Sequence, residues 1–483
     1  MLKNRNRIVF TSLIWKLLER GATQGIQFIV QIVLARLLYP EDYGIIAIVL
    51  VFISVANVFI QSGLNTALIQ KKDSDDTDFS SIFYLNLMIA GVLYIILFFT
   101  SPLISSFYNE ALLTPVLRIL SLTLFFGAFN SVQNAYIAKH LLFKKLFFSS
   151  LGAILVSASI GISMAYLNYG VWALVIQQLS NTIVISIILF FTVKWRPKLV
   201  FAAKRVKVLF SFGWKLLVSS LIDTLYRALT TLIIGKVDTK EMLGYYSKGD
   251  QIPALLINSI NGSIQSVMLP VLSAEQDNKP RVKQMMRRSI MVSSYAIFPL
   301  IVGLIVIAEP LVLLLLTEKW MMTVPFLQIL SISYAFYPIH TANLQAINAL
   351  GRSDVFLKLE ITKKIIGITI IFAAIPFGIY ALAWSTVISS VISTFINAFP
   401  SKKLLNYGYL EQIKDIAPIL LLSIIMGALV YLWTLLNLDV MTTILIQVFS
   451  GIIIYIFLSV LFKIESLKYL INTIKLILVN KQE

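Results

Sequence analysis

The sequence predicts an all-α integral membrane protein of about fourteen transmembrane helices: two six-helix lobes in a parallel pseudo-two-fold repeat, followed by two C-terminal helices. Composition, long apolar stretches and an internal repeat each point to this fold class. Of the 483 residues, 58% are hydrophobic and 13% are charged, with a mean hydropathy of +0.86. Such a chain has too little polar surface to cover a soluble body of this length.

Apolar stretches of about 20 residues or more recur along the whole chain, and each can cross a hydrocarbon core of roughly 30 Å as a helix. The predicted spans are residues 12–37, 43–69, 80–107, 115–138, 146–167, 170–192, 208–234, 243–272, 289–316, 324–349, 356–376, 378–399, 415–436 and 440–462.

The internal repeat divides these spans into two sets. The pattern Ser12, Trp15, Lys16, Leu17, Leu18 returns as Ser211, Trp214, Lys215, Leu216, Leu217, and the run YGVWAL at 169–174 returns as FGIYAL at 377–382. We therefore expect an N-terminal six-helix lobe over 1–200, a C-terminal six-helix lobe over 201–400, and helices 13 and 14 with a cytoplasmic tail over 401–483. Both copies start on the same membrane side, which makes them parallel repeats with a cleft along their shared axis.

Lysine and arginine set the predicted orientation. The formal net charge is +17, and the cations concentrate in alternate loops, most densely over 194–207 between the two halves. Positive loops face the cytoplasm, so both termini are predicted to be cytoplasmic, with the basic loops near membrane lipid headgroups. No basic aromatic module that would bind nucleic acid is visible.

Several kinds of chemistry have no signature in this chain. There is no cysteine, and His140 and His340 are the two histidines, far apart in sequence. Disulfides and thiolate metal sites are therefore excluded, no zinc-protease pattern exists, and no phosphate-binding loop of the GxxxxGK[ST] type occurs. The sequence predicts a protein that is not an enzyme and that holds no cofactor and no metal.

Polar residues at helical spacing predict which helix faces line the cleft. In the first span, Lys16, Arg20, Gln24, Gln27 and Gln31 share one face, and the repeat relates this stripe to Asp223 and Tyr226, with Arg227 beside them, in the seventh. The second and eighth spans add Asn57, Gln61 and Asn65, then Lys248, Gln251, Asn258 and Asn261. Amides both donate and accept hydrogen bonds, which suits sugar hydroxyls. Any single amide could equally join two helices.

The charged members of these stripes have two readings. Asp223 and Arg227 stand at i and i+4, where an internal ion pair is the simpler account. Arg20 has no acidic residue one turn away on its own stripe, and a charge near a helix centre costs on the order of 3 kcal/mol. That cost favours an anionic partner that is present for part of a cycle.

The segment ARLLYPEDYG, residues 35–44, carries a family resemblance. It resembles the segment after the first helix in polysaccharide-export flippases of the Wzx type, near the colanic acid and teichuronic acid exporter branch of the multidrug/oligosaccharidyl-lipid/polysaccharide superfamily. Pro40 ends the first helix, Glu41 and Asp42 suit the start of the next, and Gly44 allows a close contact. Gly244 in KVDTKEMLGYYS, residues 236–247, is the weaker copy. The resemblance extends over essentially the whole chain.

This resemblance implies a MATE-like fold and a function. The expected substrate is an undecaprenyl-diphosphate-linked oligosaccharide, moved from the cytoplasmic to the outer leaflet of a bacterial plasma membrane by alternating access of two lobes. The diphosphate would bind to Arg20, Lys16, Arg227, Lys215 and Lys248, and the glycan to the amides and Tyr226. Asp223 is the candidate for coupling to Na⁺ or H⁺. A polymerase and glycosyltransferases of a glycan assembly complex are candidate partners.

Three other classes stay open at this stage. An ion-coupled multidrug cation antiporter of the same fold would need an acidic, aromatic cavity, whereas the buried charges here are mostly positive. A membrane enzyme such as a polymerase or acyltransferase would need a sizeable catalytic loop or a His/Asp site. A non-transporting scaffold of a glycan assembly complex would fit the basic loops, and substitution of Arg20 would then be silent.

Overall fold

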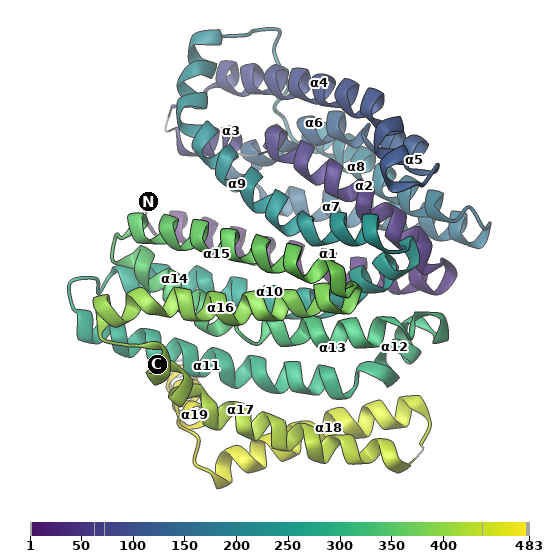
Figure 1. The fold of residues 1–483 in the computed structure, drawn as a ribbon. Helices are drawn as coiled ribbons and strands as arrows, with labels where there is room; N and C mark the ends of the chain where they lie inside the picture. The colour runs from purple at the N-terminus through teal and green to yellow at the C-terminus, as the bar shows by residue number, and fades with distance from the viewer. Residues whose placement is uncertain (1, 62, 72, 437, 480–483) are drawn as a thin grey trace. The chain divides into compact units, whose positions relative to one another are not determined.

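The protein folds as helices throughout the part of the chain that the structure, a computed structural model, describes: residues 2–61, 63–71, 73–436 and 438–479 (Figure 1). Eleven helical segments of this part are long and apolar enough to cross a membrane. The predicted fold class, an all-α integral membrane protein, is confirmed. The chain forms two compact units, Met1–Gly244 and Tyr245–Glu483.

The first unit contains the helices up to the start of α10. Their bounds are α1 Leu2–Leu37, α2 Pro40–Gln61, α3 Leu64–Gln70, α4 Asp76–Tyr108, α5 Leu113–Leu120, α6 Thr123–Lys139, α7 Phe143–Tyr166, α8 Val171–Thr192 and α9 Ala203–Val237. Helix α7 packs against α1 and α8, while α9 packs against α2, α3 and α4 (Figure 1). A buried apolar cluster around Leu68, Ile82 and Val132 joins α3, α4 and α6.

Local sequence fixes where α4 begins. Asp75 caps α4 in a reciprocal capping box with Asp78, whose side chain is fully buried. The Asp78 carboxylate lies 2.6 Å from Lys71 Nζ, and Arg205 bonds both Asp75 oxygens at 2.7 Å. The hydrogen bonds from Arg205 lower the pKa of Asp75 to about 2. The basic linker after α8, predicted as a topology signal near headgroups, is thus also tied to the start of α4.

The second unit contains the remainder of the chain. Its elements are α10 Lys240–Ser273, which starts in the first unit, α11 Lys279–Val306, α12 Ala308–Leu316, η1 Glu318–Trp320, α13 Thr323–Tyr334, α14 Tyr337–Ala349, α15 Ser353–Ala374, η2 Ile375–Phe377, α16 Ile379–Leu405, α17 Tyr409–Tyr431, η3 Leu432–Leu436, α18 Val440–Leu461 and α19 Glu465–Val479. Helix α11 packs against α14 and α17, and α16 packs against α13, α14 and α15. A buried apolar cluster lies around Met286, Tyr407 and Ile419.

Each predicted span overlaps one helix or two consecutive ones. Four are interrupted: 43–69 becomes α2 and α3, 115–138 becomes α5 and α6, 289–316 becomes α11 and α12, and 324–349 becomes α13 and α14. Helix α15 crosses the predicted span 356–376 but is absent from the eleven apolar segments, because it carries the charged residues Lys358, Glu360, Lys363 and Lys364.

The described part of the chain after the last predicted span contains one further helix, α19. Helix α19 forms there because Leu467, Leu470 and Ile471 recur at helical spacing. Leu467 and Leu470 pack against the core of the second unit.

Helix α9 opens the second repeat but packs within the first unit. The repeat boundary near residue 200 and the unit boundary at Gly244 therefore fall at different places. The predicted lobes 1–200 and 201–400 describe the sequence repeat, and as structural bodies they stay a prediction.

Three glycines of the first unit lie very close to the backbone of another segment. A Cβ atom added to Gly63, which has a φ of 80°, would lie 2.1 Å from the carbonyl oxygen of Gly213. A Cβ added to Gly44 would lie 1.7 Å from the carbonyl oxygen of Lys240, and one added to Gly244 would lie 1.9 Å from that of Pro40. Glycine is therefore required sterically at all three positions.

Candidate functional site

A cavity of about 740 Å³ lies within the first unit. Its walls come from α1, α2, α3, α6, α7 and α8. The volume is that of a small-molecule binding site rather than a packing defect. Apolar side chains cover part of the wall, namely Ile53, Ile69, Ala135, Ala138, Phe143, Leu146 and Ile185.

Amides and hydroxyls form most of the polar lining of this cavity. The amides are Asn57, Gln61, Asn65, Asn130, Asn134 and Gln178, and the hydroxyls are Thr123, Ser131, Ser150 and Thr182. All are neutral groups that donate and accept hydrogen bonds, so the surface they form is suited to a ligand with many hydroxyl groups. It offers little to a ligand recognised by charge alone.

Hydrogen bonds hold the amide wall in place. Gln61 Nε2 donates to Asn57 Oδ1 at 3.4 Å, and Asn65 Nδ2 donates to the Gln61 carbonyl oxygen at 3.2 Å. Asn65 also donates to Ser131 Oγ, which joins α3 to α6. Asn65 follows the sharp turn at Gly63 between α2 and α3. Because of this turn, the Asn65 amide lies next to those of Asn57 and Gln61 along the cavity wall.

The opposite side of the wall is also fixed. Asn130 Nδ2 donates to the Thr182 carbonyl oxygen at 3.3 Å, and its Oδ1 accepts from Ser186 Oγ at 2.9 Å. These bonds link α6 to α8. Gly127 leaves room one turn away on α6, where a Cβ atom would lie 3.3 Å from Asn57 Oδ1.

One pair of opposite charges lines the cavity. Lys16 Nζ lies 3.2 Å from Glu19 Oε2, and the Glu19 side chain is 15% exposed compared with 45% for Lys16. Ser150 Oγ donates to the other Glu19 oxygen at 3.4 Å, and Lys16 Nζ lies 5.5 Å from the centre of the Phe143 ring. The pair leaves the cavity close to electrically neutral, with a cation that is still partly accessible.

The structure brings four of the predicted site residues together in this cavity. Lys16, Asn57, Gln61 and Asn65 line it from three helices. The other predicted residues of α1 do not line it: Arg20 and Gln24 are exposed, and Gln27 and Gln31 are half-buried.

Predicted residues on α9 and α10 lie elsewhere. On α9, Lys215 and Arg227 are exposed, and Asp223 and Tyr226 are half-buried. On the part of α10 in the second unit, Lys248 is buried and donates to Gln251 Oε1 at 3.0 Å, Asn261 accepts from Thr341 Oγ1 at 2.5 Å, and Asn258 is exposed. Their roles in diphosphate binding, glycan binding and ion coupling stay predictions.

The sequence prediction of site residues did not include the α7 and α8 walls. Gln178 and Thr182 stand one helical turn apart on α8, so a polar stripe was present in that span. Ser150 gave no such signal, because serines are frequent throughout α7.

The fold and the polar cavity define the class of protein: a multi-pass helical membrane protein with a hydrogen-bonding cavity among its helices. The structure is similar to the lipid II flippase MurJ in an inward closed conformation, with a TM-score of 0.76 and 17% identity over 93% of this chain and 99% of that one. It is also similar to an inward-facing multidrug resistance transporter of the MATE family and MOP superfamily, with a TM-score of 0.61 and 15% identity over 82% of this chain and 95% of that one.

The chain belongs to the polysaccharide biosynthesis protein family, whose model matches residues 33–325. It is 26% identical to the teichuronic acid biosynthesis protein TuaB of Bacillus subtilis, over 84% of this chain and 85% of that protein. It is 24% identical to the lipopolysaccharide biosynthesis protein WzxC of Escherichia coli, over 83% and 82% of the two chains. The predicted family is confirmed.

Proposed function

We propose that this protein is a flippase that moves a polyprenyl-diphosphate-linked oligosaccharide from the cytoplasmic to the outer leaflet of a bacterial plasma membrane. Family membership and similarity to glycan biosynthesis proteins support a role in surface polysaccharide production. The observation that carries the substrate class is the cavity lined by six amides and four hydroxyls. Such a surface exchanges hydrogen bonds with water for hydrogen bonds with sugar hydroxyls at little net cost.

The glycan occupies this cavity in the proposed cycle. Its hydroxyls bond to Asn57, Gln61 and the amides of α6 and α8, while the polyprenyl tail stays in lipid. Lys16 is the cation available at the cavity for the diphosphate, and Arg20 lies exposed one turn further along α1. The substrate headgroup crosses by alternating access, with both termini in the cytoplasm.

Replacement of the cavity amides tests the proposal. Asn57→Leu and Gln61→Leu remove groups that line the cavity, and in cells whose own exporter is deleted we expect loss of surface polysaccharide and accumulation of lipid-linked glycan on the cytoplasmic face. Asn86→Leu is the matched control, because Asn86 is a buried amide of the same unit whose polar atoms have no hydrogen-bond partner among the described residues. This variant should export normally.

Transport by purified protein separates the proposal from its rivals. Proteoliposomes should translocate a fluorescent polyprenyl-diphosphate oligosaccharide and should do so slowly with Asn57→Leu. Uptake of a cationic dye with no movement of the lipid-linked sugar would identify a drug antiporter instead. Normal surface polysaccharide in the Asn57→Leu and Gln61→Leu cells, with both proteins present in the membrane, would contradict the proposed role of the cavity.

A further inference from the structure

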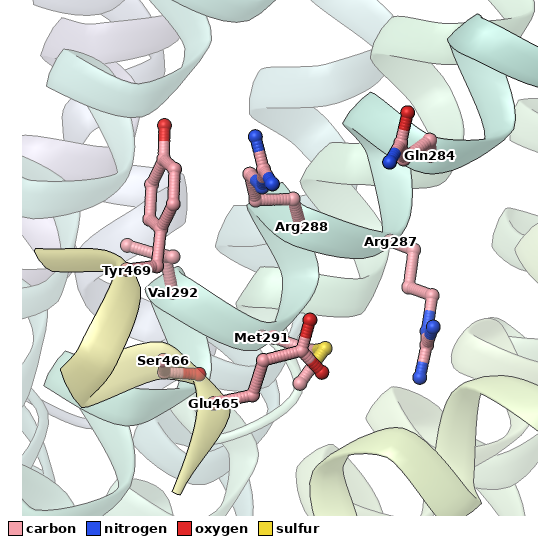
Figure 2. A pocket seen from close by; sticks show the side chains of 8 residues that line it. All are labelled: Gln284, Arg287, Arg288, Met291, Val292, Glu465, Ser466 and Tyr469. Carbon is pink, nitrogen blue, oxygen red and sulfur yellow. The ribbon is translucent and has the colours of Figure 1, made fainter. Parts of the chain in front are cut away.

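A second, smaller pocket of about 70 Å³ lies in the second unit, between α11 and the C-terminal helix α19 (Figure 2). It contains two arginines, Arg287 and Arg288, together with Glu465, Ser466 and Tyr469. At ~10–15 Å³ for each water, the space holds several waters or one small polar headgroup.

The two arginines differ in how their charge is compensated. Arg287 makes two hydrogen bonds to Asp415, at 2.9 and 2.8 Å, so a carboxylate of α17 already neutralises it. Arg288 lies 4.2 Å from the centre of the Tyr469 ring and has no carboxylate within 4.0 Å among the described residues. Figure 2 shows Arg288 and Tyr469 extending in one direction and Arg287 in the other. Arg288 is therefore the cation that remains for a ligand.

Two further groups face the same pocket. Glu465 is exposed, has no cation within 4.0 Å among the described residues, and interacts electrostatically with Arg287 of the same pocket. The Ser466 side chain is 2% exposed, and its hydroxyl has no hydrogen-bond partner in the described part of the chain. The pocket thus presents a cation, an anion and a hydroxyl together.

The position of the pocket along α11 indicates a membrane ligand. Residues 289–308, directly after Arg288, carry no charge. At ~1.5 Å per residue, this run covers roughly the 30 Å of a hydrocarbon core. Arg288 therefore lies at the boundary between the hydrocarbon and the headgroups. Helix α19 packs its apolar side on the core, as expected for a helix at an interface.

We infer that this pocket binds the headgroup of a zwitterionic aminophospholipid such as phosphatidylethanolamine. Arg288, which lies over the Tyr469 ring, binds the phosphate together with the Ser466 hydroxyl, and Glu465 binds the primary ammonium. An anionic headgroup could use Arg288 but would be repelled by Glu465. The acyl chains then lie along α11, and the lipid fastens α19 to the second unit. This inference does not rest on the proposed transport function.

Native mass spectrometry of the full-length protein with added lipid tests the site. Phosphatidylethanolamine should bind with higher occupancy than phosphatidylglycerol, and phosphatidylcholine, which has no N–H donor, should bind less. Arg288→Gln should weaken phosphatidylethanolamine binding by about tenfold, since it removes a charged hydrogen bond. Arg281→Gln is the matched control on the same helix, because Arg281 pairs with Glu275 and lies outside the pocket.

Glu465→Gln gives the sharper result. It should make phosphatidylethanolamine and phosphatidylglycerol bind equally while leaving the melting temperature unchanged. If the preference between these lipids survives in Glu465→Gln, or if Arg288→Gln binds phosphatidylethanolamine as the native protein does, the site is overturned. Equal binding of phosphatidylcholine and phosphatidylethanolamine by the native protein would also overturn it.

Discussion

At the scale of single residues, the Lys16–Glu19 pair sets the affinity of the cavity for an anion. Glu19 is the more buried partner and compensates a lysine that stays 45% exposed. We expect Lys16→Gln to weaken binding of a soluble polyprenyl-diphosphate analogue by about fivefold, because a screened charge at such a site contributes on the order of 1 kcal/mol. Glu19→Gln should strengthen binding by a similar factor. Quenching of intrinsic tryptophan fluorescence measures both affinities.

The control for this pair is Lys204→Gln, because Lys204 is an exposed lysine of the same unit that lies outside the cavity. It should change affinity little. Equal effects of Lys16→Gln and Lys204→Gln would show that the cavity does not hold the diphosphate.

The same residues show what helical spacing can and cannot predict. Helical spacing predicted Lys16 as a cavity residue because it stands on a polar stripe with Arg20 and Gln24. In the structure, the residues of α1 that line the cavity are Lys16 and Glu19. The polar stripe is a property of helix α1 alone. Which residues of α1 line the cavity depends on the helices that pack against α1. Helix α1 packs on α7, and Ser150 of α7 reaches Glu19. This packing cannot be predicted from the spacing of polar residues in α1 alone.

At the scale of elements, the crossing of α2–α3 with α9 depends on Gly63. Gly63→Ala adds both a positive-φ strain and a Cβ that would lie 2.1 Å from the Gly213 carbonyl oxygen. We expect a loss of more than about 3 kcal/mol, since strain alone costs about 1–3 kcal/mol. The thermal midpoint of the purified protein, read by size exclusion after heating, measures this loss.

Gly351→Ala separates the two causes. Gly351 also has a positive φ, 70°, but a Cβ there would meet no atom within 4 Å. Its midpoint should fall by the strain contribution alone. If the two variants melt together, the backbone contact between Gly63 and Gly213 contributes nothing beyond strain.

A second element-scale contact joins the starts of α2 and α10 reciprocally. Gly44 approaches Lys240, and Gly244 approaches Pro40, so equivalent positions of the two repeats contact each other as in a two-fold interface. The signature at 35–44 is thereby explained: its glycine allows two backbones to touch. Both pairs lie inside the first unit.

We expect Gly44→Ala and Gly244→Ala to lower transport to a similar extent, because each separates the same two backbones. The decrease in the transport rate of the double variant should be smaller than the sum of the two single decreases, because the effects of substitutions at residues in one contact are not additive. Gly25→Ala is the control, since a Cβ there meets nothing within 4 Å. Flipping rates in proteoliposomes give the comparison, and strictly additive losses would refute a shared contact.

At the scale of the whole molecule, composition and periodicity predicted the helical membrane fold and its repeat, because the bilayer constrains every span in the same way. They did not predict the interruptions in four spans or the unit to which α9 belongs. The break between α2 and α3 falls at Gly63, which has a positive φ, and α9 belongs to the first unit because it packs against α2, α3 and α4; a hydropathy pattern encodes neither feature. The C-terminal helix was missed for a related reason: its apolar stripe is too short to span a membrane and is stabilised by packing on the second unit.

Orientation is the remaining whole-molecule prediction, and the absence of cysteine makes it directly testable. The loop between α4 and α5 is predicted to face outward and the loop between α6 and α7 to face the cytoplasm. In intact cells, a membrane-impermeant maleimide should therefore label Ala111→Cys, whereas His140→Cys should react after permeabilisation alone. Both positions are exposed, so reactivity reports the side of the membrane rather than burial. The reverse pattern would invert the topology and, with it, the direction of the proposed transport.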